Sequence, residues 1–318
     1  MKTNLIAAIL ALAVMPCSAQ EAGHVRMVRR GAPPVFAWPA PASAQVIERI
    51  SHKGKITEIR YTLQVTEERG TRHLLVRRRD FQMVKYEGAA VRSEVDRKLA
   101  LFRAAPDLRV SRKGKVLNAA GQEKARRRAI DALMKEGDKG RAFRDVMRKM
   151  LADPELQLVL EWRMRDAWHA WVEGWLLPDA PPPGATRRFQ MKMPAMLGRV
   201  VKAQVVARNR GMAKTHPGHV WLTANVQYDP AELRRSMEGV FIEKARRNRA
   251  GSEAPQPKFQ PGDLESFKLA KRFDVVLDPR TLRPARCFYE LLHESKVKRQ
   301  APERGAERHD YFFNWSVR

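Results

Sequence analysis

The stretch from Asp153 to Trp175 constrains the fold more than any other part of the chain, because it holds four of the seven tryptophans. Asp153 and Pro154 are typical of a helix N-cap and a first helical residue. At 100° per residue, the large apolar side chains of this stretch fall on one arc of roughly 120°. Such a stripe needs a broad apolar partner, and we expect it to be buried against a sheet or another helix: Leu156, Leu160, Met164, Ala167, Trp168, Trp171 and Trp175.

The opposite face of this helix is predicted to carry a polar group formed by Trp162, Arg165, His169 and Glu173. Trp162 and Arg165 are spaced for a cation–π contact, and His169 and Glu173 for an i, i+4 pair. The first interpretation is a solvated or interdomain face. The second is a ligand site, for which we select Trp162, Arg165 and His169.

Two further helices are predicted before this one, at about 121–136 and 140–152. In the second, Phe143, Val146, Met147, Met150 and Leu151 recur at helical spacing. The block 119–177 therefore predicts a three-helix insertion, which ends at a proline-rich stretch that no helix can continue through.

Alternating strand patterns flank the insertion on both sides, at 44–118 and 178–318. Ile59, Tyr61, Leu63 and Val65 alternate with polar residues, and a hairpin turn is expected near Lys113-Gly114. Residues 90–105 fit either a strand or a helix. Asp229-Pro230-Ala231-Glu232 predicts the start of one more helix, at 230–247. We predict an α+β fold, a curved antiparallel sheet resembling a half-barrel with the three-helix insertion packed on it, forming one elaborated domain over 44–318.

Three consecutive arginines occur in one of the predicted strands, at Arg77, Arg78 and Arg79. Alternation places Arg77 and Arg79 on one face of the sheet and Arg78 on the other. One of these faces should be the interior or a groove. We select Arg77 and Arg79 as candidate ligand-binding residues.

The first residues read as a cleaved secretory signal, because Lys2 precedes the short apolar run Leu5–Met15 and a small-residue exit ending at Ala19. We expect a periplasmic or secreted protein with no transmembrane span and an irregular segment at 20–43, pinned by Trp38. Export would leave Cys287 as the single cysteine, and burial is the expected protection for this thiol.

The formal net charge of +26 indicates association with polyanions, such as anionic lipid or an acidic envelope polymer. The alternative is a compositional bias spread over a solvated surface. The basic runs Arg126–Arg128 and Arg246–Arg249 lack the interleaved aromatics of nucleic-acid sites, so no nucleic-acid partner is expected.

The strand pairs GRVVKAQVVA and HVWLTANVQY, followed by FDVVLDPRTLRPARCFYELL, resemble secreted bacterial half-barrel proteins of the lipoprotein-carrier (LolA-like) type, over roughly a third of the chain. The resemblance implies a curved antiparallel sheet that wraps a helix and binds acyl chains. The helical insertion departs from that plan, and it could fill the concavity in which a carrier holds lipid.

Catalytic and metal-binding signatures are not found: the sequence has no Gly-x-Ser-x-Gly, P-loop, dinucleotide fingerprint or zinc spacing. His216 and His219 flank a Pro-Gly turn, but no third ligand is adjacent, so no metal or cofactor is predicted. The predicted function is a non-catalytic binding protein for an amphiphilic or anionic envelope ligand. One alternative is a structural or interaction protein of the envelope without a cavity. The other is an enzyme, which would require His169, His216, His219, His293 or His309 to cluster in one cleft.

Overall fold

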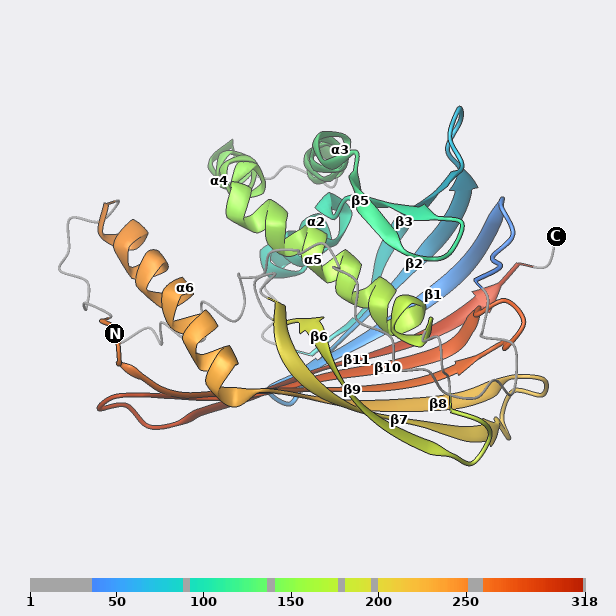
Figure 1. Cartoon of the computed structure of the whole chain (residues 1–318). Helices are drawn as coiled ribbons and strands as arrows, with labels where there is room; N and C mark the ends of the chain where they lie inside the picture. Colours follow the sequence, from blue (N-terminus) through green and yellow to red (C-terminus); the bar gives the residue numbers. More distant parts are fainter. Residues whose placement is uncertain are drawn as a thin grey trace.

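The computed structural model describes residues 36–87, 92–135, 141–176, 181–195, 200–250 and 260–316. Within them, one antiparallel sheet of eleven strands forms the body of the molecule, in the order β5-β4-β3-β2-β1-β11-β10-β9-β8-β7-β6 (Figure 1). The strands are β1 Ala42–His52, β2 Lys55–Glu67, β3 His73–Tyr86, β4 Asp107–Ser111, β5 Val116–Ala120, β6 Thr186–Pro194, β7 Val200–Met212, β8 Val220–Tyr228, β9 Leu264–Leu277, β10 Pro284–Val297 and β11 Glu303–Trp315.

The sheet is curved and remains open between its edge strands β5 and β6 (Figure 1). β1 pairs with β2 on one side and with β11 on the other, so the N-terminal strand joins the two halves of the sheet. This arrangement confirms the predicted α+β fold with a curved antiparallel sheet.

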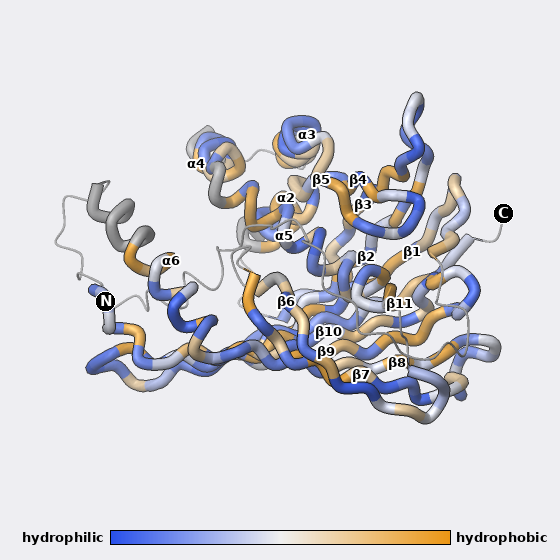
Figure 2. Tube along the Cα trace, in the orientation of Figure 1, coloured by the Kyte–Doolittle hydropathy of each residue, from blue (hydrophilic) through white to orange (hydrophobic). Residues whose placement is uncertain are grey.

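Alternation of apolar and polar residues produces the two faces of the sheet (Figure 2). In β7, Val201, Ala203, Val205 and Ala207 are buried, and the residues between them are exposed or half-buried. The hairpin between β1 and β2 turns on Lys53-Gly54, both with positive φ, as a two-residue hairpin loop requires. The expected turn near Gly114 is present as well, between β4 and β5.

The helices are α2 Arg92–Ala104, α3 Gln122–Lys135, α4 Arg141–Ala152, α5 Pro154–Trp171 and α6 Pro230–Ala250, with a short 3-10 turn η1 at Glu173–Trp175. The three-helix insertion is confirmed as α3, α4 and α5. The strand-rich stretch 44–118 is interrupted by a helix, because residues 92–104, which fit either a strand or a helix, form α2. Its buried Leu99, Ala100 and Ala104 pack as a helix face, which the sequence pattern alone left undecided.

α5 crosses the concave side of the sheet (Figure 1). Every residue of the predicted stripe is at most 5% exposed, and Trp168 and Trp171 are fully buried. The prediction of a single buried face was too narrow, because Val159, Glu161, Asp166 and Ala170 on other sides of α5 are buried too. Besides the strands β9 and β10, the strand β4 and the helices α2 and α4 contact α5, and Gln122 of α3 donates a hydrogen bond to Glu161.

Trp38 fastens the N-terminal segment to the core, as expected. Its ring packs edge-on against Trp168 at 5.1 Å and Trp315 at 4.8 Å. Cys287 is also buried as expected, beneath α5, with Sγ 3.4 Å from the carbonyl oxygen of Ala170. The predicted signal segment 1–19 lies outside the described residues, as do residues 20–35 of the predicted irregular segment.

α6 begins where the capping pattern predicts. Asp229 Oδ1 accepts a hydrogen bond from the backbone N–H of Glu232 at 2.7 Å. The Glu232 carboxylate does not close a reciprocal capping box and instead accepts a hydrogen bond from the backbone N–H of Lys202 in β7 at 2.9 Å. The cap therefore also ties α6 to the sheet.

Candidate functional site

A cavity of about 410 Å³ lies between the concave face of the sheet and the helices α2 and α5. The middle of α5, from Leu160 to Ala167, forms part of its wall. Trp168 and Trp171 follow in the helix and pack in the core against Trp38, Tyr311 and Phe313. Apolar side chains from five elements supply much of the lining: Ile50 of β1, Leu101 and Phe102 of α2, Leu160 and Ala167 of α5, Leu291 of β10 and Tyr311 of β11.

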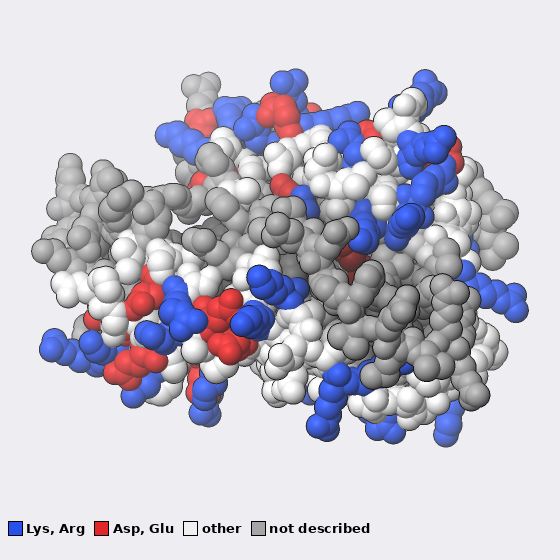
Figure 3. Space-filling view, viewed as in Figure 1, with Lys and Arg blue, Asp and Glu red and all other residues white. Residues whose placement is uncertain are grey.

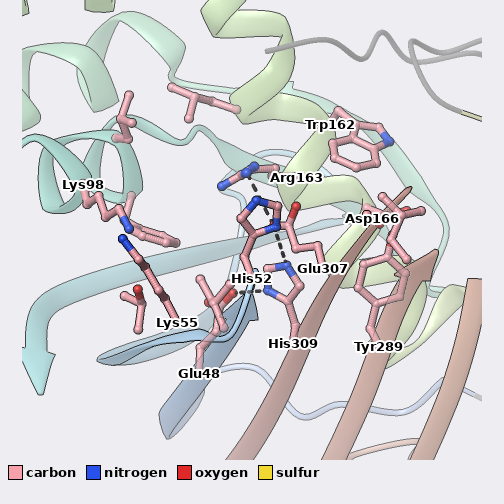
Figure 4. Close-up of a pocket in the computed structure, with 18 of the residues that line it drawn as sticks. Glu48, His52, Lys55, Lys98, Trp162, Arg163, Asp166, Tyr289, Glu307 and His309 are labelled. Carbon is pink, nitrogen blue, oxygen red and sulfur yellow. Dashed lines mark hydrogen bonds and ion pairs between the residues drawn. The ribbon is translucent and has the colours of Figure 1, made fainter. Parts of the chain in front are cut away.

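A buried histidine between two carboxylates forms the floor of the cavity (Figure 4). His309 Nδ1 lies 2.9 Å from Glu48 Oε1, and its Nε2 lies 2.9 Å from Glu307 Oε1. Burial alone would lower the pKa of His309, but the hydrogen bonds and charges of Glu307 and Glu48 raise it to about 9. Both ring nitrogens are therefore protonated at neutral pH and donate to the two carboxylates.

Two arginines flank this cluster. Arg163 of α5 approaches Glu307 to 3.5 Å, and Arg78 of β3 approaches Glu48 to 3.9 Å. The Arg78 guanidinium also lies over the rings of Tyr61 and Phe81, at 5.5 and 5.6 Å from their centroids. Burial would raise the pKa of Glu48, but His309 and Arg78 lower it overall. The floor is thus a continuous row of alternating charges.

A second buried ion pair joins α5 to the sheet beside the cavity. Lys271 Nζ of β9 lies 2.7 Å from Asp166 Oδ1, and both side chains are less than 10% exposed. The ammonium also lies 5.7 Å from the Trp162 ring and 5.8 Å from the Tyr289 ring. Burial would lower the pKa of Lys271, and the opposite charge of Asp166 raises it overall.

Lysines occupy the end of the cavity formed by β1, β2 and α2. Lys53, Lys55 and Lys98 all line it, and Figure 4 shows the side chains of Lys55 and Lys98 reaching toward one another. Lys98 Nζ also lies 4.3 Å from the centroid of the Tyr86 ring. The lining as a whole contains six Lys and Arg side chains and four Asp and Glu side chains. The cavity therefore combines an apolar wall with an excess of positive charge.

The residues selected from the sequence are only partly brought together. Trp162 lines the cavity. Arg165 instead pairs with Glu161 of its own helix at 2.8 Å, and His169 lies beside the Phe273 ring at 5.8 Å between centroids. Burial and the charge of Lys271 lower the pKa of His169 to about 4, so it is neutral.

Arg77 and Arg79 lie on the opposite face of β3 from Arg78, where both pair with Asp107 at 3.2 and 2.9 Å. Neither lines the cavity, and their role as ligand-binding residues stays a prediction. The rings of His216 and His219 lie edge-on to each other at the β7–β8 turn, with centroids 5.8 Å apart. No group of three potential metal ligands occurs among the described residues.

Sequence reasoning missed Glu48, Lys271 and Glu307. It named His309 only for the enzyme alternative, and it selected the neighbours of Arg78 in place of Arg78 itself. Each occupies a position where the period-2 pattern of its strand points inward, as Glu48 does between Val46 and Ile50. A charged residue at a position where the alternation expects an inward-facing apolar residue indicates a polar site in the interior. This pattern could have identified these residues from the sequence.

Histidines do cluster at the cavity, since His52, His293 and His309 all line it. His169, His216 and His219 are not among the lining residues. Burial and the nearby charge of His52 lower the pKa of His293. His309 is held by two carboxylates and has no lone pair left to act as a base. The lining side chains among the described residues include no serine or cysteine that could serve as a nucleophile.

Comparison with known proteins identifies no family: no family profile and no curated protein matches the chain. Among solved structures, the chain is similar to one titled "Lipid-protein interactions in lipovitellin", with 5% identity and a TM-score of 0.39. The match covers 86% of this chain and 24% of that one, so this chain spans about a quarter of its length. A likeness this weak does not transfer a function, and the predicted resemblance to lipoprotein carriers stays a prediction.

Two surface observations complete the description. Lys and Arg side chains are spread over much of the visible face (Figure 3). No helix in the described ranges is long and apolar enough to cross a membrane.

Proposed function

We propose that this is a periplasmic or secreted, non-catalytic binding protein that holds an anionic amphiphile in the cavity beneath α5. The observation that carries the proposal is the cavity itself, whose apolar wall is combined with an excess of cationic side chains. Its volume of about 410 Å³ falls within the range of small-molecule sites. An apolar tail would be removed from water against Leu160, Ala167 and Leu291, and an anionic group would meet the positive charge.

The open cavity disfavours the alternative of a structural protein whose sheet is fully plugged. Trp168, Trp171 and Trp175 do fill one half of the concavity, as that alternative requires. Glu48 Oε2 and Tyr289 Oη at the cavity are buried without hydrogen-bond partners among the described residues, as are Trp38 Nε1 and Trp171 Nε1 in the packed core. Only the atoms at the cavity lie where a polar ligand could supply the missing hydrogen bonds.

An enzyme remains the second alternative, supported by the three histidines at the cavity. The pairing of His309 with Glu48 and Glu307 favours a structural or ligand-orienting role for this group, because both of its N–H groups are already used. Incubation of the purified protein with fatty-acid and phospholipid esters separates the two functions: a binder leaves them intact, and turnover would support the enzyme.

The binding test uses two variants of β10 with the same Leu-to-Trp substitution, one on the cavity face of the strand and one on the opposite face. Leu291 lines the cavity, and its neighbour Leu292 does not. We expect Leu291→Trp to fill the cavity and abolish uptake of a fluorescent fatty acid, whereas Leu292→Trp should bind as the wild type does. Organic extraction and mass spectrometry of the protein purified from its native host should also recover a co-purifying amphiphile. A lipid-free extract together with no uptake by the wild type would refute the binding function.

Export requires its own test, because the proposed signal lies outside the described residues. The full-length chain expressed in a bacterial host should appear in the periplasmic or extracellular fraction, with a mass that corresponds to cleavage after Ala19. Retention of the uncleaved chain in the cytoplasm would contradict the proposed location without bearing on the cavity.

A further inference from the structure

The positive charge at the cavity is unevenly compensated. Glu48 and Glu307 both pair with His309, and Asp166 forms an ion pair with Lys271. Arg163 approaches Glu307 to 3.5 Å, and Arg304 pairs with Glu294 at 2.8 Å. Within the described ranges, Lys53 and Lys55 have no carboxylate at ion-pair distance, and the nearest carboxylate oxygen to Arg78 is 3.9 Å away. The uncompensated charge therefore concentrates where β1, β2 and β3 border the cavity.

Arg78 is the buried member of this group. Its side chain is 7% exposed, and Glu48, its ion-pair partner among the described residues, is already held by His309 at 2.9 Å. Arg78 Nε is buried without a hydrogen-bond acceptor in the part of the chain that the structure describes. A guanidinium has five N–H donors, and a buried one is costly unless acceptors surround it. An anionic or strongly polar ligand group beside the Arg78 guanidinium would supply an acceptor for this buried N–H group.

Lys55 and Lys98 supply further positive charge beside Arg78. They come from the start of β2 and from α2, and their side chains reach toward one another at the cavity end (Figure 4). The hydroxyl-bearing Thr57, two residues along β2 from Lys55, is 7% exposed and lines the same cavity. Planar guanidinium and point-charge ammonium groups together suit the oxygens of a carboxylate or phosphate group.

We propose that Arg78, Lys55 and Lys98 form the subsite that binds the anionic head of the cavity ligand, a carboxylate or a phosphate monoester. This inference rests on the proposed function, and it assigns the ligand an orientation: the head lies at the β1–β3 end, and the tail extends along the apolar wall toward Trp162. The Glu48–His309–Glu307 row then keeps Arg78 in place as a positioning group.

The test compares probes that share a tail and differ in the head: dodecanoate, dodecyl phosphate and dodecan-1-ol, each titrated calorimetrically below its micelle concentration. The Lys55→Gln/Lys98→Gln variant should bind at least one of the two anionic probes about tenfold more weakly, because charge-assisted hydrogen bonds are lost. Its affinity for dodecan-1-ol should change less than about twofold. The matched control, Lys113→Gln/Lys124→Gln, removes the same charge from exposed lysines that do not line the cavity.

A second variant pair examines Arg78 itself. Arg78→Met should weaken the anionic probes at least as much as the lysine variant does, and Arg78→Lys should restore part of the affinity. If Arg78→Met does not fold, the Lys55→Gln/Lys98→Gln variant alone tests the subsite. Equal weakening of the charged and neutral probes, or no weakening at all, would overturn the subsite while leaving the cavity function intact. Wild-type binding of the alcohol alone would overturn the subsite and the anionic class of the ligand, and would leave only an apolar binding cavity. Binding of none of the three probes would refute the proposed function, and the subsite with it.

Discussion

Trp171 and Trp162 belong to the same helix but have different surroundings. Trp171 is fully buried and packs edge-on against Tyr311 and Phe313, at 5.2 and 5.4 Å between ring centroids. Trp162 is partly buried and lies beside Lys271 at the cavity. We predict that Trp171→Ala lowers the free energy of unfolding by about 3–5 kcal/mol, the usual cost for a core aromatic. Urea denaturation measures it, provided that the transition is two-state.

The control for this prediction is Trp162→Ala, which should cost about 1 kcal/mol. The indole at 162 borders a cavity, so its loss creates less new empty space inside packed side chains. Equal losses for the two variants would mean that the cavity is closed in solution and that both faces of α5 are packed alike.

The three consecutive arginines Arg77, Arg78 and Arg79 have different surroundings in the structure. Alternation correctly separated Arg78 from its two neighbours, but it could not say which face was interior. The structure places Arg78 inside and pairs Arg77 and Arg79 with Asp107 on β4, a residue 28 or more positions away. A bulge at Asp80, with φ of 57°, then shifts the alternation so that Phe81 also points inward.

At the scale of elements, the pairing of β10 with β11 depends on a glycine at the cavity wall. Gly305 lies opposite His293, and a Cβ atom added at Gly305 would lie 2.1 Å from His293 Cε1. We predict that Gly305→Ala destabilises the protein by about 1–3 kcal/mol, the usual cost of overpacking. Thermal or urea denaturation would measure the loss.

A double-mutant cycle tests the stated cause. In the His293→Ala background, Gly305→Ala should be nearly neutral, because the imidazole that it displaces is gone. A loss of the same size in both backgrounds would show that the strand backbone at 305, and not the contact with His293, requires glycine.

At the scale of the whole molecule, the Glu48–His309–Glu307 row couples stability to pH. The pKa of His309 is raised from 6.5 to about 9, so the folded protein binds this proton more tightly than the unfolded chain does. Its stabilisation is complete below about pH 6.5 and is lost as the pH rises through about 9. The shift corresponds to an effect on the order of 3 kcal/mol.

We therefore predict that His309→Gln costs more unfolding free energy at pH 6 than at pH 10. His169, whose pKa is lowered, is present in both proteins, so its own pH dependence cancels in the difference. Glu48 and Glu307 have lowered pKa values and act in the opposite sense, since their stabilisation is present above about pH 4.5 and is lost as the pH falls. A difference that does not change between pH 6 and pH 10 would show that His309 is not protonated in the folded state.

The sequence by itself determined the features of this protein that depend on the pattern of neighbouring residues. Helical spacing in the stretch Asp153–Trp175 predicted its buried stripe, Asp229-Pro230 predicted the start of α6, and period-2 alternation predicted most of the strands and the class of fold. Residues 90–105 were undecided because their apolar positions suit both periods, and burial against neighbouring elements settled α2 as a helix.

The tertiary structure alone decided the site. Glu48 and His309 are 261 residues apart and meet because β1 pairs with β11, a long-range pairing that no local pattern encodes. Whether the tryptophans of α5 would fill the concavity also depended on where the helix crosses the curved sheet. Trp168 and Trp171 fill one side, near the C-terminal end of α5, whereas Leu160, Trp162 and Ala167 line the space that remains. Side-chain volumes can be read from a sequence, but the shape of the space that they must fill is set only when the sheet has curved around them.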